Sequence, residues 1–377
     1  MKTRTVRRYL DSAWSVICAL GLLFAAHSAW AETTRDGRYL YVVCPGIRDY
    51  LEFGGTGILM FDMDNGHKFV KRIATPASRE VKADNIKGVC ACAATKRLYF
   101  TTRSKLYCVD LVTEETLWET TPPHGTDRMS ITPDGKTIYV PSFEKETWNV
   151  VDAASGKQIK EIETKSGAHN TVVSRDGQRM YLGGLKSPLV FVSDVKTHEI
   201  VQKVGPFAGA IRPFTVNGAR TRAYVCVNEC LGFEIGDLTT EKKLHRVEVA
   251  GFQKGAVKRH GCPSHGIGLT PDEKEVWVVD AFNQRVHVFD NTTEPPKQKE
   301  SIAVRDQPGW ITFSLDGKLA YPSTGEVIDT ATKKIVTALA DEKGGQVHSE
   351  KMVEIQWKGG VPVAVGDQFG VGRVAPK

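Results

Sequence analysis

The chain has 377 residues, of which 41% are hydrophobic and 25% charged, and its formal net charge is +6 at pH 7. The first 31 residues hold four cations and one acid, so the remainder carries about +3, a charge too small to indicate nucleic-acid binding. The length allows one large domain or two or three ordinary ones, and internal repeats decide between these options.

The N-terminal segment has the pattern of a secretory signal peptide. Four basic residues precede an apolar run over residues 13–26, and Ala29-Trp30-Ala31 has the small-x-small form of a cleavage site. No second apolar run is long enough to span a membrane. We predict a signal peptide over residues 1–31 and a periplasmic or secreted mature chain over residues 32–377, without a membrane span after cleavage.

One pattern of strands and turns recurs along the rest of the chain. An apolar strand leads to a tight turn such as Asp134-Gly135 or Asp176-Gly177, then to a strand containing Tyr-Val, then to a Val-x-Val-x-Asp strand. Asp-Gly favours a hairpin because Gly accepts a positive φ and Asp hydrogen-bonds its own backbone. Convincing amphipathic helices are absent. A repeat of about 40 residues with about four short strands is typical of a β-propeller.

The number of repeats predicts an all-β fold of seven four-stranded blades. Six complete blades extend from about Gly88 to Ala338. The strands over residues 39–74 and 352–367 remain at the two ends of the chain, and pairing them would close the ring and remove two exposed edges. Residues 361–365 form a surplus strand that competes with residues 39–43, so the count is open by one.

The spacing of the cysteines does not indicate a cofactor. Seven follow the predicted signal peptide, and an odd number cannot all pair, so disulfides and buried free thiols both remain open. A Cys-x-x-Cys-His sequence is absent, which argues against covalently attached haem. A serine nucleophile elbow and a phosphate-cradling loop are also absent, so we expect no nucleotide.

The runs after the turns carry a family resemblance. Tyr139-Val-Pro-Ser142, Tyr224-Val-Cys-Val227 and Trp277-Val-Val-Asp280 are degenerate forms of Tyr-Val-Thr-Asn. In this feature the chain resembles the YVTN-repeat β-propellers over nearly its whole mature length. The resemblance implies an extracytoplasmic seven-bladed propeller. Such propellers serve as binding proteins and surface-layer components, and more distant relatives include lyases, lactonases and redox domains.

Equivalent positions in successive blades gather polar residues. Twelve residues before the Tyr-Val strand stand Asp127, His169, Arg212, His265 and Gly309. A propeller places such positions around one mouth of its central channel. Other residues expected near this mouth are His124, Arg128, Glu229, His260, Asp280, Trp310, His348, Glu350 and Asp367.

Histidines that converge on an axis with a carboxylate are suitable ligands for zinc, manganese or another divalent metal. The predicted metal ligands are His124, His169, His265 and His348. The predicted catalytic residues, if the protein is an enzyme, are His169, His265 and Arg212. The predicted ligand-binding residues are Asp127, Arg128, Glu229, Asp280, Trp310 and Glu350.

Structural roles compete with these assignments. His265 could cap a backbone turn, Trp310 could be an ordinary core aromatic, and any single histidine is more often a satisfied polar residue than a ligand. His67, His198, His245 and His287 are expected on outer strands or turns, in contact with solvent.

Three functions remain open. The first is binding of a small anionic or carbohydrate ligand at the mouth, with or without a divalent metal. The second is a metal-dependent lyase or lactonase acting on uronate-type sugars there. The third is a protein-interaction scaffold without a small-molecule site. We expect a monomer that binds no nucleic acid.

Overall fold

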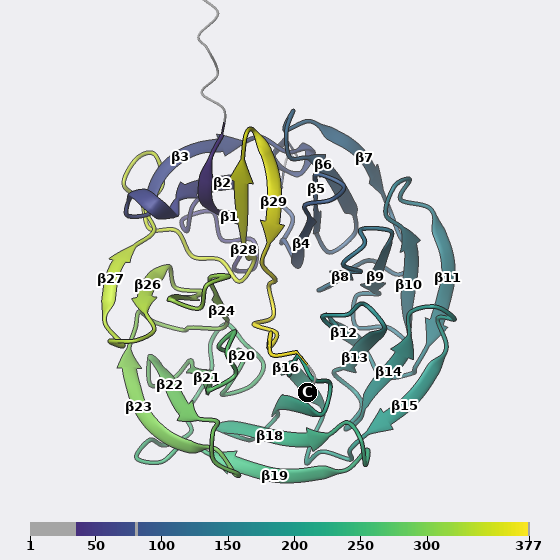
Figure 1. Ribbon diagram of the computed structural model, residues 1–377, viewed down its shortest axis with the longest axis vertical. Coiled ribbons are helices and arrows are strands. Elements are labelled where there is room, and N and C mark those ends of the chain that lie inside the picture. The colour runs from purple at the N-terminus through teal and green to yellow at the C-terminus, as the bar shows by residue number, and fades with distance from the viewer. Residues whose placement is uncertain (1–34, 80–81, 376–377) are drawn as a thin grey trace, which may run out of the picture. The chain divides into compact units, whose positions relative to one another are not determined.

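The computed structural model describes residues 35–79 and 82–375, so the predicted signal peptide lies outside the described residues. These residues form seven antiparallel sheets arranged around a ring (Figure 1). The only helical segments in the described ranges are two 3-10 turns, η1 (Met63–Asn65) and η2 (Pro76–Arg79). The predicted all-β, seven-bladed propeller is confirmed.

Six of the blades are contiguous in sequence, each with four strands in chain order from the inner to the outer edge. The first two blades consist of β4 (Gly88–Cys92), β5 (Arg97–Thr101), β6 (Leu106–Asp110) and β7 (Thr116–Thr120), and of β8 (Ser130–Ile131), β9 (Thr137–Pro141), β10 (Thr147–Asp152) and β11 (Gln158–Glu163). The next two consist of β12 (Ala168–Val173), β13 (Arg179–Gly184), β14 (Val190–Asp194) and β15 (Ile200–Val204), and of β16 (Ile211–Val216), β17 (Arg222–Val227), β18 (Gly232–Asp237) and β19 (Lys243–Glu248). The last two consist of β20 (Ile267–Leu269), β21 (Glu275–Asp280), β22 (Arg285–Asp290) and β23 (Lys297–Ala303), and of β24 (Ile311–Phe313), β25 (Leu319–Pro322), β26 (Glu326–Asp329) and β27 (Ile335–Ala338).

The Asp-Gly turns specify the hairpins locally. Between β8 and β9, Oδ1 of Asp134 accepts hydrogen bonds from the Thr132 hydroxyl at 2.6 Å and from the Lys136 amide at 3.1 Å. Gly135 follows with φ 71°, a left-handed conformation that glycine adopts without a Cβ penalty. The same side-chain bond from Ser or Thr to Asp recurs at Asp176, Asp272 and Asp316. In these four blades the repeated motif therefore specifies the inner hairpin through contacts within a few residues.

The seventh blade closes the ring with strands from both ends of the chain. Its order is β29 (Val361–Val365), β28 (Met352–Lys358), β1 (Gly37–Cys44), β2 (Gly57–Asp62) and β3 (Lys68–Ile73). Tyr39 of β1 is paired with Ile355 of β28, which confirms the predicted closure. β29 does not compete with β1, because it pairs with the opposite edge of β28. This blade thus has five strands instead of the four predicted.

The chain after β29 crosses the centre of the ring and ends near β16 (Figure 1). The carbonyl of Gly370 accepts hydrogen bonds from the Leu269 amide at 2.9 Å and from the Thr215 hydroxyl at 2.8 Å. Oε1 of Gln368 accepts one from the Val89 amide at 2.8 Å. A pocket of about 420 Å³ lies between this tail and the C-terminal ends of the inner strands β4, β8 and β12. The tail therefore lies across one end of the channel.

Among the described residues, no helix is long and apolar enough to cross a membrane.

All seven cysteines of the described residues are free thiols, and six are buried, with Cys90 partly exposed. Of the two options left open by the sequence, the structure has free thiols.

Candidate functional site

A polar cavity of about 330 Å³ lies at the end of the ring where the inner strands begin. We call it the mouth cavity. Its charged wall contains seven basic side chains and two acidic ones, together with three histidines. The basic residues are Arg48, Lys87, Arg103, Arg128, Arg212, Arg259 and Lys351, the acidic ones are Glu144 and Glu350, and the histidines are His169, His260 and His265. The cavity is therefore strongly cationic.

His169 connects a buried acid to a buried arginine. Its Nδ1 lies 2.7 Å from Oδ2 of Asp127, and its Nε2 lies 3.2 Å from Nη1 of Arg128. An arginine only donates, so Nε2 accepts and Nδ1 carries the proton that Asp127 accepts. Burial lowers the pKa of His169 to about 4, against the opposing effect of Asp127. His169 is thus a neutral imidazole with both nitrogens engaged.

Asp127 is fully buried beneath the cavity wall. Burial alone would raise its pKa, but Lys87, His169 and Arg128 outweigh that effect and hold the pKa well below its usual value. Lys87 Nζ lies 3.4 Å from Oδ1 of Asp127 and 5.1 Å from the centre of the Phe143 ring. Asp127 is therefore an ionised counter-charge for the cations around it.

Glu350 is the second buried carboxylate. Its Oε2 accepts from Arg128 Nη2 at 2.5 Å and from Lys351 Nζ at 2.8 Å. Burial would raise the pKa of Glu350, but Lys351 and Arg128 hold it well below its usual value. Burial also lowers the pKa of Lys351 to about 8, although Glu350 opposes this shift. Lys351 also donates to the carbonyl of Gly46 at 2.9 Å.

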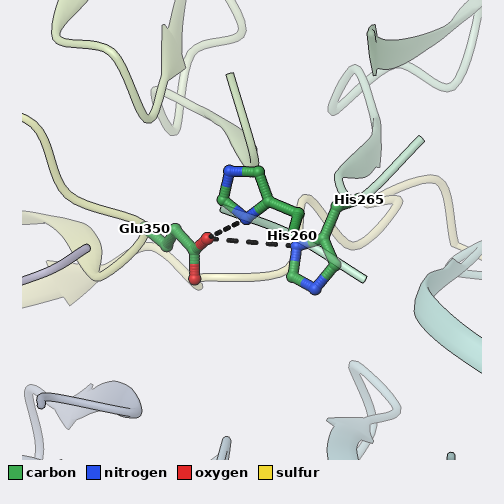
Figure 2. A group of neighbouring side chains, drawn as sticks. All are labelled: His260, His265 and Glu350. Carbon is green, nitrogen blue, oxygen red and sulfur yellow. Dashed lines mark ion pairs between the residues drawn. The ribbon is translucent and has the colours of Figure 1, made fainter. Parts of the chain in front are cut away.

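Two histidines lie on the other side of Glu350, and Figure 2 shows their rings facing its carboxylate. His260 Nδ1 is 3.2 Å from Oε1 of Glu350, and His265 Nδ1 is 3.9 Å from the same oxygen. His260 Nε2 is 3.2 Å from the carbonyl of Gln307. Both nitrogens of His260 thus face oxygen acceptors.

His265 hydrogen-bonds to a backbone carbonyl, as expected if it caps a backbone turn. Its Nδ1 lies 3.1 Å from the carbonyl oxygen of Gly309. Burial, with a further contribution from His260, lowers its pKa well below the usual value. Because a neutral ring donates from Nδ1 to this carbonyl, its Nε2 is left as an acceptor.

Three arginines at the edge of the mouth cavity have only neutral partners among the described residues. Arg48 donates to the carbonyl of Arg259 at 2.9 Å. Arg212 donates to the Asn228 side-chain oxygen at 2.6 Å and to the carbonyl of Gly261 at 3.0 Å. The Arg259 guanidinium lies 4.9 Å from the centre of the Phe53 ring. We call Arg48, Arg212 and Arg259 the rim arginines.

The structure brings seven of the predicted site residues to the mouth cavity or directly beneath it. Arg128, His169, Arg212, His265 and Glu350 line it, and Asp127 and Trp310 lie just below. The Trp310 ring lies 4.8 Å from the Arg128 guanidinium, and its indole N–H donates to the Gln368 carbonyl at 2.6 Å. Trp310 is thus a buried support for Arg128 rather than an exposed stacking platform.

Four other predicted residues lie outside the cavity wall. His124 is exposed on a loop, and Glu229 is exposed and paired with Lys254. Asp280 is buried, 3.2 Å from His287. His348 stacks on Phe53 with ring centres 4.2 Å apart. Asp280 is the last residue of β21, and the other three lie on loops that direct them away from the cavity.

Two histidines expected to be solvated are instead buried. His67 accepts or donates a 3.0 Å hydrogen bond with the Tyr321 hydroxyl, and His287 lies 2.8 Å from the Ser301 hydroxyl. His67 is covered by Tyr321 of the neighbouring blade. His287 bonds to Ser301 within its own blade, and its ring centre lies 4.9 Å from that of Phe252 in the connection between β19 and β20. Their expected exposure was wrong because strand alternation within one blade does not report the contacts that other blades and loops make with it.

Five cations in the cavity wall were not among the predicted site residues: Arg48, Lys87, Arg103, Arg259 and Lys351. Lys87 had an available signal, since it stands twelve residues before Tyr99, in the same alignment that gave Asp127 and His169. Lys351 immediately follows Glu350. The arginines come from loops, whose paths the strand repeat does not encode.

Comparison with known proteins adds little to this geometry. No protein-family model and no curated protein matches the chain. One of the solved structures that match is "Kuenenia stuttgartiensis Hydrazine Synthase", at 14% identity, with 65% of this chain and 95% of that chain covered and a TM-score of 0.44. A likeness this distant carries no argument about function. The structure itself shows that the chain is a seven-bladed β-propeller with a cationic mouth cavity.

Proposed function

We propose that this protein is an extracytoplasmic binding protein that takes a small anionic ligand in the mouth cavity. The observation that carries the proposal is the wall of seven basic side chains against two carboxylates. Preorganised arginine N–H groups in a partly enclosed cavity bind carboxylate and phosphate oxygens well, because the local dielectric is low and the donors are already oriented. A concave site shared by several blades is also the usual place for a ligand.

The site favours direct anion binding over binding through a metal. His260, His265 and Glu350 offer ligand atoms that all lie within 4.8 Å of one another, so these three residues could hold a divalent ion. However, Nδ1 of His260 faces Glu350 as a donor, Nδ1 of His265 faces a carbonyl, and Glu350 is already paired with Arg128 and Lys351. A metal would have to displace a proton and enter a cationic cavity.

The proposal is tested by measuring binding of a panel of small organic and inorganic anions by calorimetry, at fixed ionic strength, to the mature protein. Arg212→Gln removes one rim charge, and Lys136→Gln removes one charge from an exposed turn between β8 and β9, at the other end of the strands from the cavity. We expect at least one anion to bind the wild type and the Lys136→Gln variant, and to bind Arg212→Gln at least roughly tenfold more weakly. No binding by any anion, or equal binding by all three proteins, would refute the proposal.

A metal-dependent site is the second candidate, carried by the His260, His265 and Glu350 group. Elemental analysis of protein purified without chelator or affinity tag would test it, with a His260→Gln, His265→Gln double variant as the comparison. Near-stoichiometric zinc or manganese that is lost in the double variant would establish the metal site and favour the lyase or lactonase alternative. Metal-free wild-type protein would exclude a tightly bound resident ion.

A further inference from the structure

We infer that the ligand of the mouth cavity carries at least two negative charges and that the rim arginines select it over monoanions. This inference rests on the proposed anion-binding function and specifies its ligand class: a small polycarboxylate or a phosphate compound. Positive charge around the cavity is paired with carboxylates at the bottom and has no carboxylate partner at the rim.

The cations at the bottom of the cavity are paired with carboxylates of the protein. Arg128 and Lys351 share the carboxylate of Glu350, and Lys87 pairs with Asp127. Arg103, also in the cavity wall, pairs with Asp84 at 3.0 Å. Three carboxylates thus face these four cations, so an incoming anion would have to compete with the carboxylates for them.

The rim arginines have no such compensation. Their partners are backbone carbonyls, one asparagine oxygen and aromatic rings. Seven cations line the cavity, and four carboxylates lie in or behind its wall: Glu144, Glu350, Asp84 and Asp127. The cavity therefore has an excess of three positive charges.

The three guanidinium groups are also fixed in position from different parts of the ring. Arg48 follows β1, Arg212 lies in β16, and Arg259 lies in the long connection between β19 and β20. Arg48 is hydrogen-bonded to the backbone of Arg259, so the two loops touch each other at the mouth. Like charges held in one cavity repel, and a ligand with one negative charge would relieve only part of this repulsion.

The test is calorimetric titration with acetate, succinate, citrate and pyrophosphate at constant ionic strength and neutral pH. We expect citrate or pyrophosphate to bind at least roughly a hundredfold more tightly than acetate, because each additional charge-assisted contact contributes about tenfold. The tighter of citrate and pyrophosphate identifies the ligand as a polycarboxylate or a phosphate compound.

The variants separate specific recognition from general attraction to a cationic protein. Arg212→Gln and Arg259→Gln should each reduce the preference for citrate or pyrophosphate over acetate by roughly tenfold, whereas Lys136→Gln, which lowers the net charge equally, should retain it. Unfolding temperatures of all variants show that they fold. Equal affinity for acetate and the polyanions would overturn this inference and leave the proposed function standing. Failure of every anion to bind would overturn both.

Discussion

His169 Nδ1 lies 2.7 Å from Oδ2 of Asp127, and both side chains are buried at the base of the mouth cavity. This hydrogen bond fixes the tautomer of His169, and the opposite ring nitrogen then accepts from Arg128. Arg128 lies against the Trp310 ring and reaches Glu350. One buried acid thereby orients a chain of side chains that extends across the cavity floor.

Substituting Asp127 with Asn should destabilise the fold strongly. The change keeps the shape of the side chain but removes the charge that Lys87 and Arg128 face, and breaking a buried ion pair costs about 3–5 kcal/mol. Urea unfolding gives the free energy. Glu163→Gln, at a carboxylate with a side chain 57% exposed, should change it by less than about 0.5 kcal/mol. A loss of similar size in both variants would contradict the ionised state of Asp127.

The stability of the protein should depend on pH through His67. Burial, with help from Arg38, lowers the pKa of His67 to about 4 from its usual 6.5. The unfolded chain therefore binds more protons between these values, so the free energy of unfolding falls as the pH drops from 6.5 towards 4. At pH 4.5 this loss is roughly 2–3 kcal/mol for a single group.

A His67→Gln variant removes this titration and retains a polar group that can bond to the Tyr321 hydroxyl. Unfolding free energies of the wild type and the variant at pH 7 and pH 4.5 should converge at the lower pH. Curves that stay parallel would show that His67 is not held neutral in the fold.

The C-terminal tail should contribute to stability through Phe369. This ring is 3% exposed, and its centre lies 5.7 Å from that of Trp310. Phe369→Ala should cost about 3–5 kcal/mol in the free energy of unfolding, because it leaves a cavity where the tail crosses the channel. Val374→Ala, at a side chain that is 41% exposed in the same tail, should cost less than about 0.5 kcal/mol. Equal effects would mean that the tail is not packed in the channel.

The cysteines of residues 35–375 should be unreactive in the folded protein and all reactive in the unfolded one. Burial raises the pKa of Cys44 and Cys262 to about 12 and that of the partly exposed Cys90 well above its usual value, so little thiolate is present at pH 8. Alkylation followed by mass spectrometry should label the seven thiols only after denaturation, without reductant. A thiol that remains unlabelled in denaturant would reveal a disulfide.

The sequence predicted the fold well because each blade repeats its own turn chemistry. Asp134-Gly135 and its counterparts specify hairpins through contacts within a few residues, and the interval between them gives the number of blades. The role of residues 361–365 could not be predicted in the same way. β29 pairs with the far edge of β28 through the tight turn at Gly359 and Gly360, while β1 occupies the other edge, and the spacing of the repeats does not show which of the two edges each strand takes.

The site residues that occupy equivalent positions in the strand repeat could be predicted from the sequence. The site residues that lie on loops could not. Asp127, His169, Arg212 and His265 share one register position, and all four reach the mouth cavity or its base. Lys87 obeys the same rule. His124 was predicted from its nearness to Asp127, and His348 from its position ahead of the last inner strand. The direction of a loop side chain is set by contacts such as the stacking of His348 on Phe53.

The pairing of β1 with β28 has a consequence for biosynthesis. The ribosome makes β1 and β2 early, and they can form a hairpin at once, but the other edge of β1 has no partner until residues 352–358 have been synthesised. An unpaired strand edge is a template for association with other chains. A chain released early, before Met352, would lack the strand that closes the ring, and we expect such truncated products to aggregate or to be degraded instead of accumulating as six-bladed rings.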